Sequence, residues 1–152
     1  MFASLLMALA LRGPVPSFSL KQLDGSSFRL ADHLGRQVIV LDFWATWCGP
    51  CTRSLKKLQE LHVQYPQVLV LAVASDDGRT MAEVKPYVQG RGFSFTVLLD
   101  PESSVCRLFN PAGGVPCAAV IDRRGAMVYQ HNGYLPGDER ALFSAVADSL
   151  AQ

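Results

Sequence analysis

The sequence has almost no excess of either charge. Lysine and arginine together number 14, and aspartate and glutamate together number 13. A protein that binds nucleic acid or an anionic surface usually has a basic excess, so this balance gives no case for such a partner. The chain also has no internal repeat and no low-complexity tract. With 49% apolar and 18% charged residues over 152 positions, it is expected to form one ordinary globular domain.

Cysteines are few and unevenly spaced. There are four, Cys48, Cys51, Cys106 and Cys117, which is too few for a disulfide scaffold at this length. A structural zinc site usually takes two close pairs of ligands, but the second two cysteines stand eleven residues apart and no histidine completes a ligand pattern. A disulfide across the close pair would close only a minimal loop, so it would stabilise the fold little. Redox exchange is therefore favoured over a metal site or a structural staple.

Long apolar runs are also missing, apart from a short one in residues 1–12. This run, MFASLLMALAL, is shorter than the roughly 20 residues that span a bilayer. It resembles the apolar part of a signal peptide, and Ala8-Leu9-Ala10 looks like a cleavage site, although no positive charge precedes it. Two interpretations stay open: the remnant of an export signal or membrane anchor, and a helix that docks on the domain or on a second chain. The main domain is expected over residues 13–152.

Strand and helix patterns alternate along this domain. Two short alternating runs around residues 24–27 predict a β-hairpin, and the apolar run VIVLDFW at residues 38–44 predicts a strand buried on both faces. Further strands are expected at 68–74, 95–99, 117–121 and 126–130, and helices at about 50–65, 81–91, 102–109 and 142–150. This order predicts an α/β sheet with helices on both faces.

The close cysteine pair, in the stretch Trp47-Cys48-Gly49-Pro50-Cys51, stands between the strand at 38–44 and the helix that follows it. A cysteine at a helix N-terminus meets unpaired N–H groups and the positive end of the helix dipole, so its pKa falls from about 8.5 toward roughly 7. Proline is tolerated in the first turn of a helix. The preceding strand would hold the pair at the carboxyl edge of the sheet, where α/β proteins place their sites.

The stretch LDFWATWCGPC at residues 41–51 resembles the active-site strand and loop of thioredoxins. The wider pattern resembles the bacterial TlpA/ResA group of thioredoxin-like, AhpC/TSA-related proteins, and it extends from about Gly13 to Tyr134. The stretches that carry it are PSFSL at 16–20, LDGSSFRLADHLG at 23–35, FSFTVLLDPES at 93–103 and GVPCAAVIDRRG at 114–125.

This resemblance implies a thioredoxin fold: a central mixed β-sheet flanked by helices, with an N-terminal β-hairpin and a central insertion. It implies a thiol–disulfide oxidoreductase that reduces disulfides of partner proteins, takes electrons from a protein donor and needs no bound cofactor or metal. The expected location is the periplasm, or a membrane anchor that faces outside the cytoplasm, with residues 1–12 as a possible tether.

The resemblance also assigns roles to residues of the loop. It implies that Cys48 is the exposed nucleophile and that Cys51 is buried and displaces the bound partner. Pro116 aligns with a cis-proline facing the pair, which would leave the backbone of Val115 free to pair with an extended substrate strand. Trp47 would cover the rim of the site, next to Gly49 and Pro50.

Two acidic residues are candidates for proton transfer. Asp42 is the one polar residue in VIVLDFW, and burial of a lone carboxyl raises its pKa. Such a group beneath Cys51 could take the proton of that thiol, directly or through water; the alternative is a structural carboxyl held by backbone donors. Asp77 stands roughly where many TlpA-like relatives have another acid, and the simpler interpretation is an ordinary loop residue.

The remaining cysteines and tryptophans each have two interpretations. Cys117 follows Pro116 and could lie near the close pair and influence substrate choice, or it could be a small buried residue. Cys106 is expected to be buried in the same way. Trp44 is expected to pack behind the loop.

Two features depart from the TlpA/ResA pattern. Ser54 and Lys56 stand where relatives often have glutamate and proline, so a helix kink is expected to be missing. The loop before Pro116 is one residue longer than usual, which leaves the identity of the substrate open.

Rival functions remain from the sequence alone. A thiol peroxidase shares this fold, but it usually has threonine three residues before its nucleophile, and Ala45 stands there. A binding module with incidental thiols and a general thioredoxin-like reductase of the cytoplasm also stay open.

Overall fold

The computed structural model describes residues 15–152, and the apolar segment at 1–12 lies outside them. A seven-stranded sheet runs through the described residues in the order β2-β1-β5-β4-β3-β6-β7. Its strands are β1 (Ser19–Gln22), β2 (Ser27–Arg29), β3 (Ile39–Trp44), β4 (Leu69–Ala74), β5 (Thr96–Leu99), β6 (Cys117–Ile121) and β7 (Met127–Asn132). The central strands β3, β4 and β5 are parallel, while β6, β7 and the β1–β2 hairpin pair antiparallel, so the sheet is mixed as predicted.

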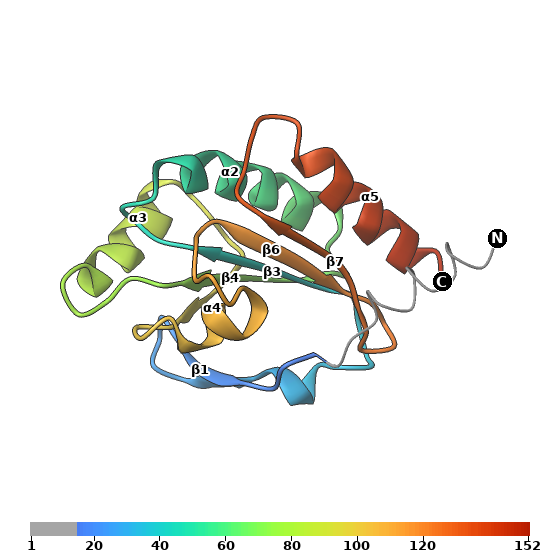
Figure 1. Cartoon of the computed structure of the whole chain (residues 1–152), viewed down its shortest axis with the longest axis horizontal. Coiled ribbons are helices and arrows are strands. Elements are labelled where there is room, and N and C mark those ends of the chain that lie inside the picture. The colour runs from blue at the N-terminus through green and yellow to red at the C-terminus, as the bar shows by residue number, and fades with distance from the viewer. Residues whose placement is uncertain (1–14) are drawn as a thin grey trace.

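Helices cover both faces of this sheet, as the alternating pattern predicted. They are α2 (Gly49–Gln64), α3 (Val84–Gly90), α4 (Ser104–Phe109) and α5 (Glu139–Leu150), with short 3-10 turns η1 (Leu30–Asp32) and η2 (Met81–Glu83). Figure 1 shows α2 and α5 on one side of the sheet and α4 on the other. The predicted boundaries agree with these to within a few residues, and α2 runs without interruption, as the missing proline at position 56 led us to expect.

The alternation of β3 divides the core into two layers. Val40 and Trp44 pack toward α2 and α5, whereas Leu41 and Phe43 pack toward α4 and the N-terminal hairpin. All six residues of β3 are buried. Because side chains alternate along a strand, Asp42 faces the same layer as Val40 and Trp44. The central strand thus places one carboxyl group beneath the helix that carries the cysteine pair.

Candidate active site

Cys48 and Cys51 form a disulfide at the N-terminus of α2, with their Cα atoms 5.4 Å apart. Cys48 is the N-cap residue and has extended backbone angles, while Pro50 lies in the first turn of the helix. The backbone N–H of Cys48 donates to the carbonyl of Ala45, 3.1 Å away. The loop therefore turns tightly from β3 into the helix and brings the two sulfurs together in the oxidised state.

The two cysteines differ little in exposure. Cys48 keeps 6% of its surface exposed and Cys51 keeps none. Cys48 was expected to be exposed, and this expectation is wrong: the residue is largely buried. Its side chain is joined to Cys51 and packs with the apolar layer under α2. Solvent still reaches only Cys48 of the two. The adjacent Trp47 is 65% exposed and lies at the rim of the site, whereas Trp44 is fully buried against Tyr87, with 5.1 Å between ring centres.

Pro116 stands directly before β6, and the Val115–Pro116 peptide bond is cis, as the resemblance implied. Strand β6 pairs with β3 so that Cys117 lies opposite Phe43. The start of β6 is thus beside the end of β3, where the cysteine loop begins. The carbonyl of Pro116 accepts from the N–H of Gly133 at 2.7 Å, and within residues 15–152 no backbone hydrogen bond uses Val115.

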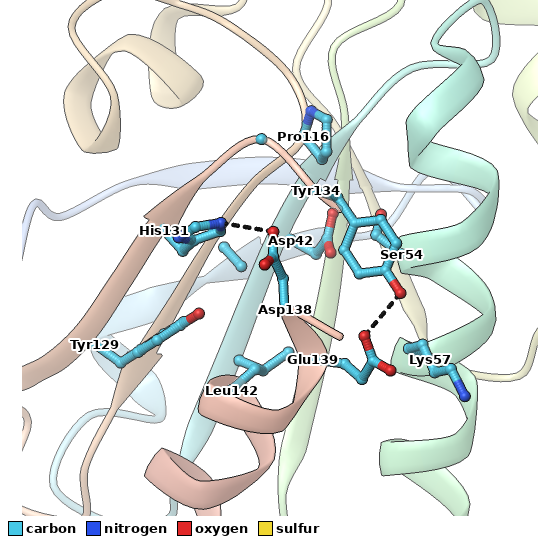
Figure 2. Close-up of a pocket in the computed structure, with 12 residues that line it drawn as sticks. Asp42, Ser54, Lys57, Pro116, Tyr129, His131, Tyr134, Asp138, Glu139 and Leu142 are labelled. Carbon is cyan, nitrogen blue, oxygen red and sulfur yellow. Dashed lines mark hydrogen bonds and ion pairs between the residues drawn. The ribbon is translucent and has the colours of Figure 1, made fainter. Parts of the chain in front are cut away.

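Asp42 is 2% exposed, and burial raises its pKa to about 8. Its Oδ1 atom has no hydrogen-bond partner among the described residues. It borders a cavity of about 30 Å³, which is enough space for a water molecule. The cavity is lined by Asp42, Ser54, Lys57, Pro116, Ala118, Tyr129, His131, Gly133, Tyr134, Asp138, Glu139 and Leu142. Figure 2 shows the Asp42 carboxyl among these side chains. Of the two interpretations for Asp42, a structural carboxyl held by backbone donors does not match this unpartnered oxygen.

Two polar contacts lie at the edge of this cavity. Nε2 of His131 and Oδ2 of Asp138 are 3.0 Å apart, and the hydroxyl of Tyr134 donates to Glu139 at 2.8 Å (Figure 2). Burial, with the hydrogen bond to Glu139 as a further cause, raises the pKa of Tyr134 to about 12. The hydroxyl of Ser54 donates to the carbonyl of Cys51 at 3.0 Å. Ser54 therefore adds a hydroxyl to the cavity wall beneath the disulfide.

Asp76 is a residue of the site that sequence analysis missed. It is fully buried, and its carboxyl accepts hydrogen bonds from the backbone N–H and the hydroxyl of Thr46. Asp77 instead points outward and pairs with Arg79 at 2.8 Å, and that contact lowers the pKa of Asp77. Asp77 is thus an ordinary loop residue in its contacts. The sequence signal for Asp76 was its place two residues after the end of β4, the strand that pairs in parallel with β3.

Cys117 does not face the cysteine pair. It is fully buried in the layer on the α4 side of the sheet, together with Cys106. Burial is the largest cause that raises the pKa of both thiols, to about 11 for Cys117. The interpretation that Cys117 lies near the active pair is therefore wrong. Cys117 pairs opposite Phe43, and side chains alternate along β6, so its thiol points to the face of the sheet away from the pair.

Residues 15–152 contain no group of three or more His, Cys, Asp or Glu side chains that could hold a metal ion. A helix with the length and hydrophobicity of a membrane span is likewise absent from residues 15–152.

A redox-active cysteine pair at a helix N-terminus, beside a cis-proline loop in a mixed sheet, defines a thioredoxin-fold thiol–disulfide oxidoreductase. The chain belongs to the AhpC/TSA family, whose model matches residues 11–130. It is similar to the thiol–disulfide oxidoreductase ResA of Geobacillus kaustophilus, with 32% identity over 78% of this chain and 67% of that protein. The ResA of Bacillus anthracis is also 32% identical, over 76% of this chain and 65% of that protein.

Solved structures show the same architecture. A putative thiol:disulfide interchange protein DsbE from Chlorobium tepidum superposes with a TM-score of 0.82 at 32% identity, over 91% of this chain and 97% of that one. The exposed lipoprotein thioredoxin of Streptococcus pneumoniae superposes with a TM-score of 0.72 at 28% identity, over 88% and 99%. Family and fold therefore agree with the class that the site defines.

Proposed function

We propose that this protein reduces disulfides of partner proteins outside the cytoplasm by exchange at the Cys48–Cys51 pair. The observation that carries the proposal is the disulfide at the N-terminus of α2, next to a loop whose Val115 backbone makes no hydrogen bond within residues 15–152. A thiol placed there is ionised easily, and a partner segment can reach it along a free backbone edge.

In the first step, the Cys48 thiolate attacks one sulfur of the partner's disulfide. A bond forms between Cys48 and that sulfur, and the other partner sulfur leaves as a thiolate that takes a proton from solvent. Cys48 is assigned this role because solvent reaches it and not Cys51. As the N-cap residue, it also receives the favourable field of the helix dipole.

In the second step, the Cys51 thiolate attacks Cys48, so that the Cys48–Cys51 bond forms and the bond between Cys48 and the partner breaks. The partner's second sulfur leaves as a thiolate that takes a proton from solvent. Asp42 takes the proton of the Cys51 thiol, directly or through the small cavity that it borders. The pKa of about 8 suits this task, because a base is most useful when its pKa lies near the working pH. Two electrons have then passed to the partner, and the pair is left oxidised, as in the structure.

A protein dithiol must reduce the pair again before the next cycle. The Gly-Pro dipeptide between the cysteines favours a reducing potential, near the roughly −270 mV of thioredoxin. That potential would drive electrons from this chain to partner disulfides. A measured potential above about −150 mV would reverse the direction that we assign.

The partner segment binds in extended form along the Pro116 loop. Val115 offers it a free N–H and carbonyl, while Trp47 supplies an exposed apolar surface beside the disulfide. Gly49 and Pro50 are both exposed and leave room over the sulfurs. Main-chain pairing of this kind gives affinity without requiring one partner sequence.

A periplasmic or membrane-anchored location is the best supported one. One similar solved structure is that of an exposed lipoprotein, and an oxidising compartment is where structural disulfides persist and need reduction. Residues 1–12, as a signal remnant or tether, would deliver the chain there. Fractionation of cells that express the full chain tests this, and recovery only with cytoplasmic markers would contradict it.

Insulin reduction with dithiothreitol as electron source tests the activity. We expect turnover in the wild type, none in Cys48→Ser, and unchanged turnover in the control Cys106→Ala, whose thiol is buried in the opposite layer. Cys51→Ser should accumulate a mixed disulfide on Cys48, from which the partner can be identified. Peroxide consumption that survives Cys51→Ser but not Cys48→Ser would indicate a thiol peroxidase instead.

A further inference from the structure

A hollow of about 360 Å³ opens beside the disulfide. One wall is the first turn of α2, and the other is the loop between β7 and α5, which Figure 1 shows reaching over toward α2. The lining residues are Gly49, Pro50, Arg53, Tyr134, Leu135 and Pro136. Because Gly49 and Pro50 are the two residues between the cysteines, the hollow begins at the reactive pair.

A second hollow, of about 390 Å³, continues along α2. It shares Arg53, Tyr134 and Pro136 with the first and adds Lys56, Lys57, Glu60 and Glu139. We call the two together the α2 groove. It leads away from the disulfide on the helix side, whereas the Pro116 loop lies on the side of β6.

Leu135 gives the α2 groove an exposed apolar side chain. It is 72% exposed, although its loop is tied down by hydrogen bonds. The N–H of Leu135 donates to Asp138 at 2.7 Å, and the N–H of Gly137 donates to Glu139 at 2.9 Å. Leu135 is thus held outward beside the reactive pair, where an apolar side chain of a partner can pack against it.

Some charged side chains of the α2 groove have a partner within residues 15–152, and others have no ion pair there. Lys57 pairs with Glu60 at 3.1 Å, and Glu139 accepts from Tyr134 and from Gly137. Arg53 and Lys56 are exposed, and neither has an ion pair with a carboxylate among residues 15–152. The groove thus offers two unpaired cations and one apolar side chain to an incoming partner.

Resting on the thiol–disulfide exchange proposed above, we propose that the α2 groove selects partner segments that carry acidic residues and an apolar residue near the reactive cysteine. The acidic side chains pair with Arg53 and Lys56, and the apolar side chain packs on Leu135 and Pro136. Attraction between opposite charges raises the rate at which partner and protein meet and favours acidic partners over neutral ones. It does not change the exchange reaction itself. The groove therefore influences which partner is bound, while the cysteine pair reduces the partner's disulfide.

Single-turnover oxidation of the reduced full chain tests this with a set of peptide mixed disulfides. Each peptide has one cysteine joined to a chromogenic thiol and a leucine beside it. Three aspartates stand on the N-terminal side in one peptide and on the C-terminal side in another, and matched peptides have asparagine instead. We expect one of the acidic peptides to react at least about fivefold faster than its asparagine match at low salt. That advantage should disappear in high salt.

Variants of the groove test which residues cause the faster reaction of the acidic peptide. Arg53→Gln combined with Lys56→Gln should bring the acidic peptide down to the rate of its match and leave the asparagine peptides unchanged. Arg123→Gln, in the exposed turn between β6 and β7, makes the same type of charge change away from the groove and should keep the advantage. Leu135→Ser should slow all peptides, whereas Leu108→Ser, a 53% exposed leucine on α4, should not.

Equal rates for acidic and asparagine peptides in the wild type would overturn the proposal, as would an advantage that survives the double variant. Either result would leave the exchange activity itself intact, because the asparagine peptides would still react. If no peptide and no small neutral disulfide oxidises the reduced protein, the proposed function fails instead.

Discussion

The carboxyl group of Asp76, two residues past the end of β4, accepts hydrogen bonds from both the backbone N–H and the hydroxyl of Thr46, which stands two residues before Cys48. This contact joins the ends of two parallel strands. Asp76 is fully buried, and its carboxyl is the acceptor for the Thr46 N–H. Loss of that carboxyl would therefore leave the N–H without its partner. The position of the Trp47–Cys48 turn therefore depends on a residue almost thirty positions further along the chain.

Asp76→Ala is expected to destabilise the fold and loosen the active-site turn. A fully buried donor left without its partner costs about 1–3 kcal/mol. Because Thr46 is half-buried, the free energy of unfolding in denaturant should fall by about 1 kcal/mol, the lower end of that range. The rate of insulin reduction should fall with it. Asp77→Ala is the matched control, because the Asp77 carboxylate is exposed and, among the described residues, accepts hydrogen bonds from Arg79 alone, through its guanidinium and its backbone N–H. An exposed pair of this kind contributes little to stability. Equal losses of stability and activity in the two variants would show that Asp76 does not hold the active-site turn in place.

Asp42→Asn should change how stability depends on pH. Burial raises the pKa of Asp42 to about 8 in the folded protein, whereas in the unfolded chain this carboxyl ionises near pH 4. Between these two pH values the unfolded chain binds fewer protons at Asp42 than the folded protein does. The free energy of unfolding of the wild type therefore falls as pH rises, by at most about 1.4 kcal/mol per pH unit. The difference in unfolding free energy between Asp42→Asn and wild type should therefore grow from about pH 4 to about pH 8 in favour of the variant. Denaturant unfolding of the oxidised proteins measures it, and a constant difference would show that the carboxyl is ionised in the folded state.

The same substitution should prolong the mixed disulfide. If Asp42 takes the proton of Cys51, Asp42→Asn should slow release of the reduced partner by roughly 10²-fold, the usual worth of a general base. Attack by Cys48 should stay at its wild-type rate. Rapid acid quench with separation of the covalent species follows both steps. Asp77→Asn provides the comparison, and a slow release step there but not in Asp42→Asn would move the proton role to Asp77.

Cys106 and Cys117 should remain unreactive in the folded protein. Both are fully buried, and burial raises the pKa of the Cys117 thiol to about 11, so few thiolates form near neutral pH. When the reduced protein is treated with iodoacetamide, mass spectrometry should find the label on Cys48 first. The other two cysteines should be labelled only after denaturant is added. Labelling of Cys117 at the rate of Cys48 in the folded protein would show that it is accessible to the site after all.

The fold was largely predictable because its signals are local. The apolar run at 38–44 and the turn residues at 24–27 each describe a segment without reference to the rest of the chain, and β3 and the N-terminal hairpin follow them. The stretch at 47–51 likewise specified a cysteine pair at the start of a helix, since proline is accepted in that first turn. The cost of burying Asp42 was also predictable, from its apolar neighbours alone.

Other features of the site depend on how distant segments meet. Cys117 follows Pro116 in sequence, but pairing opposite Phe43 turns it to the far face of the sheet. Asp76 and Asp77 are neighbours of the same type, and only the path of the chain after β4 decides which one turns inward to Thr46.

The α2 groove exists because α5 packs beside α2 and carries the loop at 134–136 with it. The sequence by itself determined which residues are chemically able to exchange disulfides. Tertiary structure decided which side chains surround them, because a side chain's partners are set by register, face and packing rather than by its neighbours in the chain.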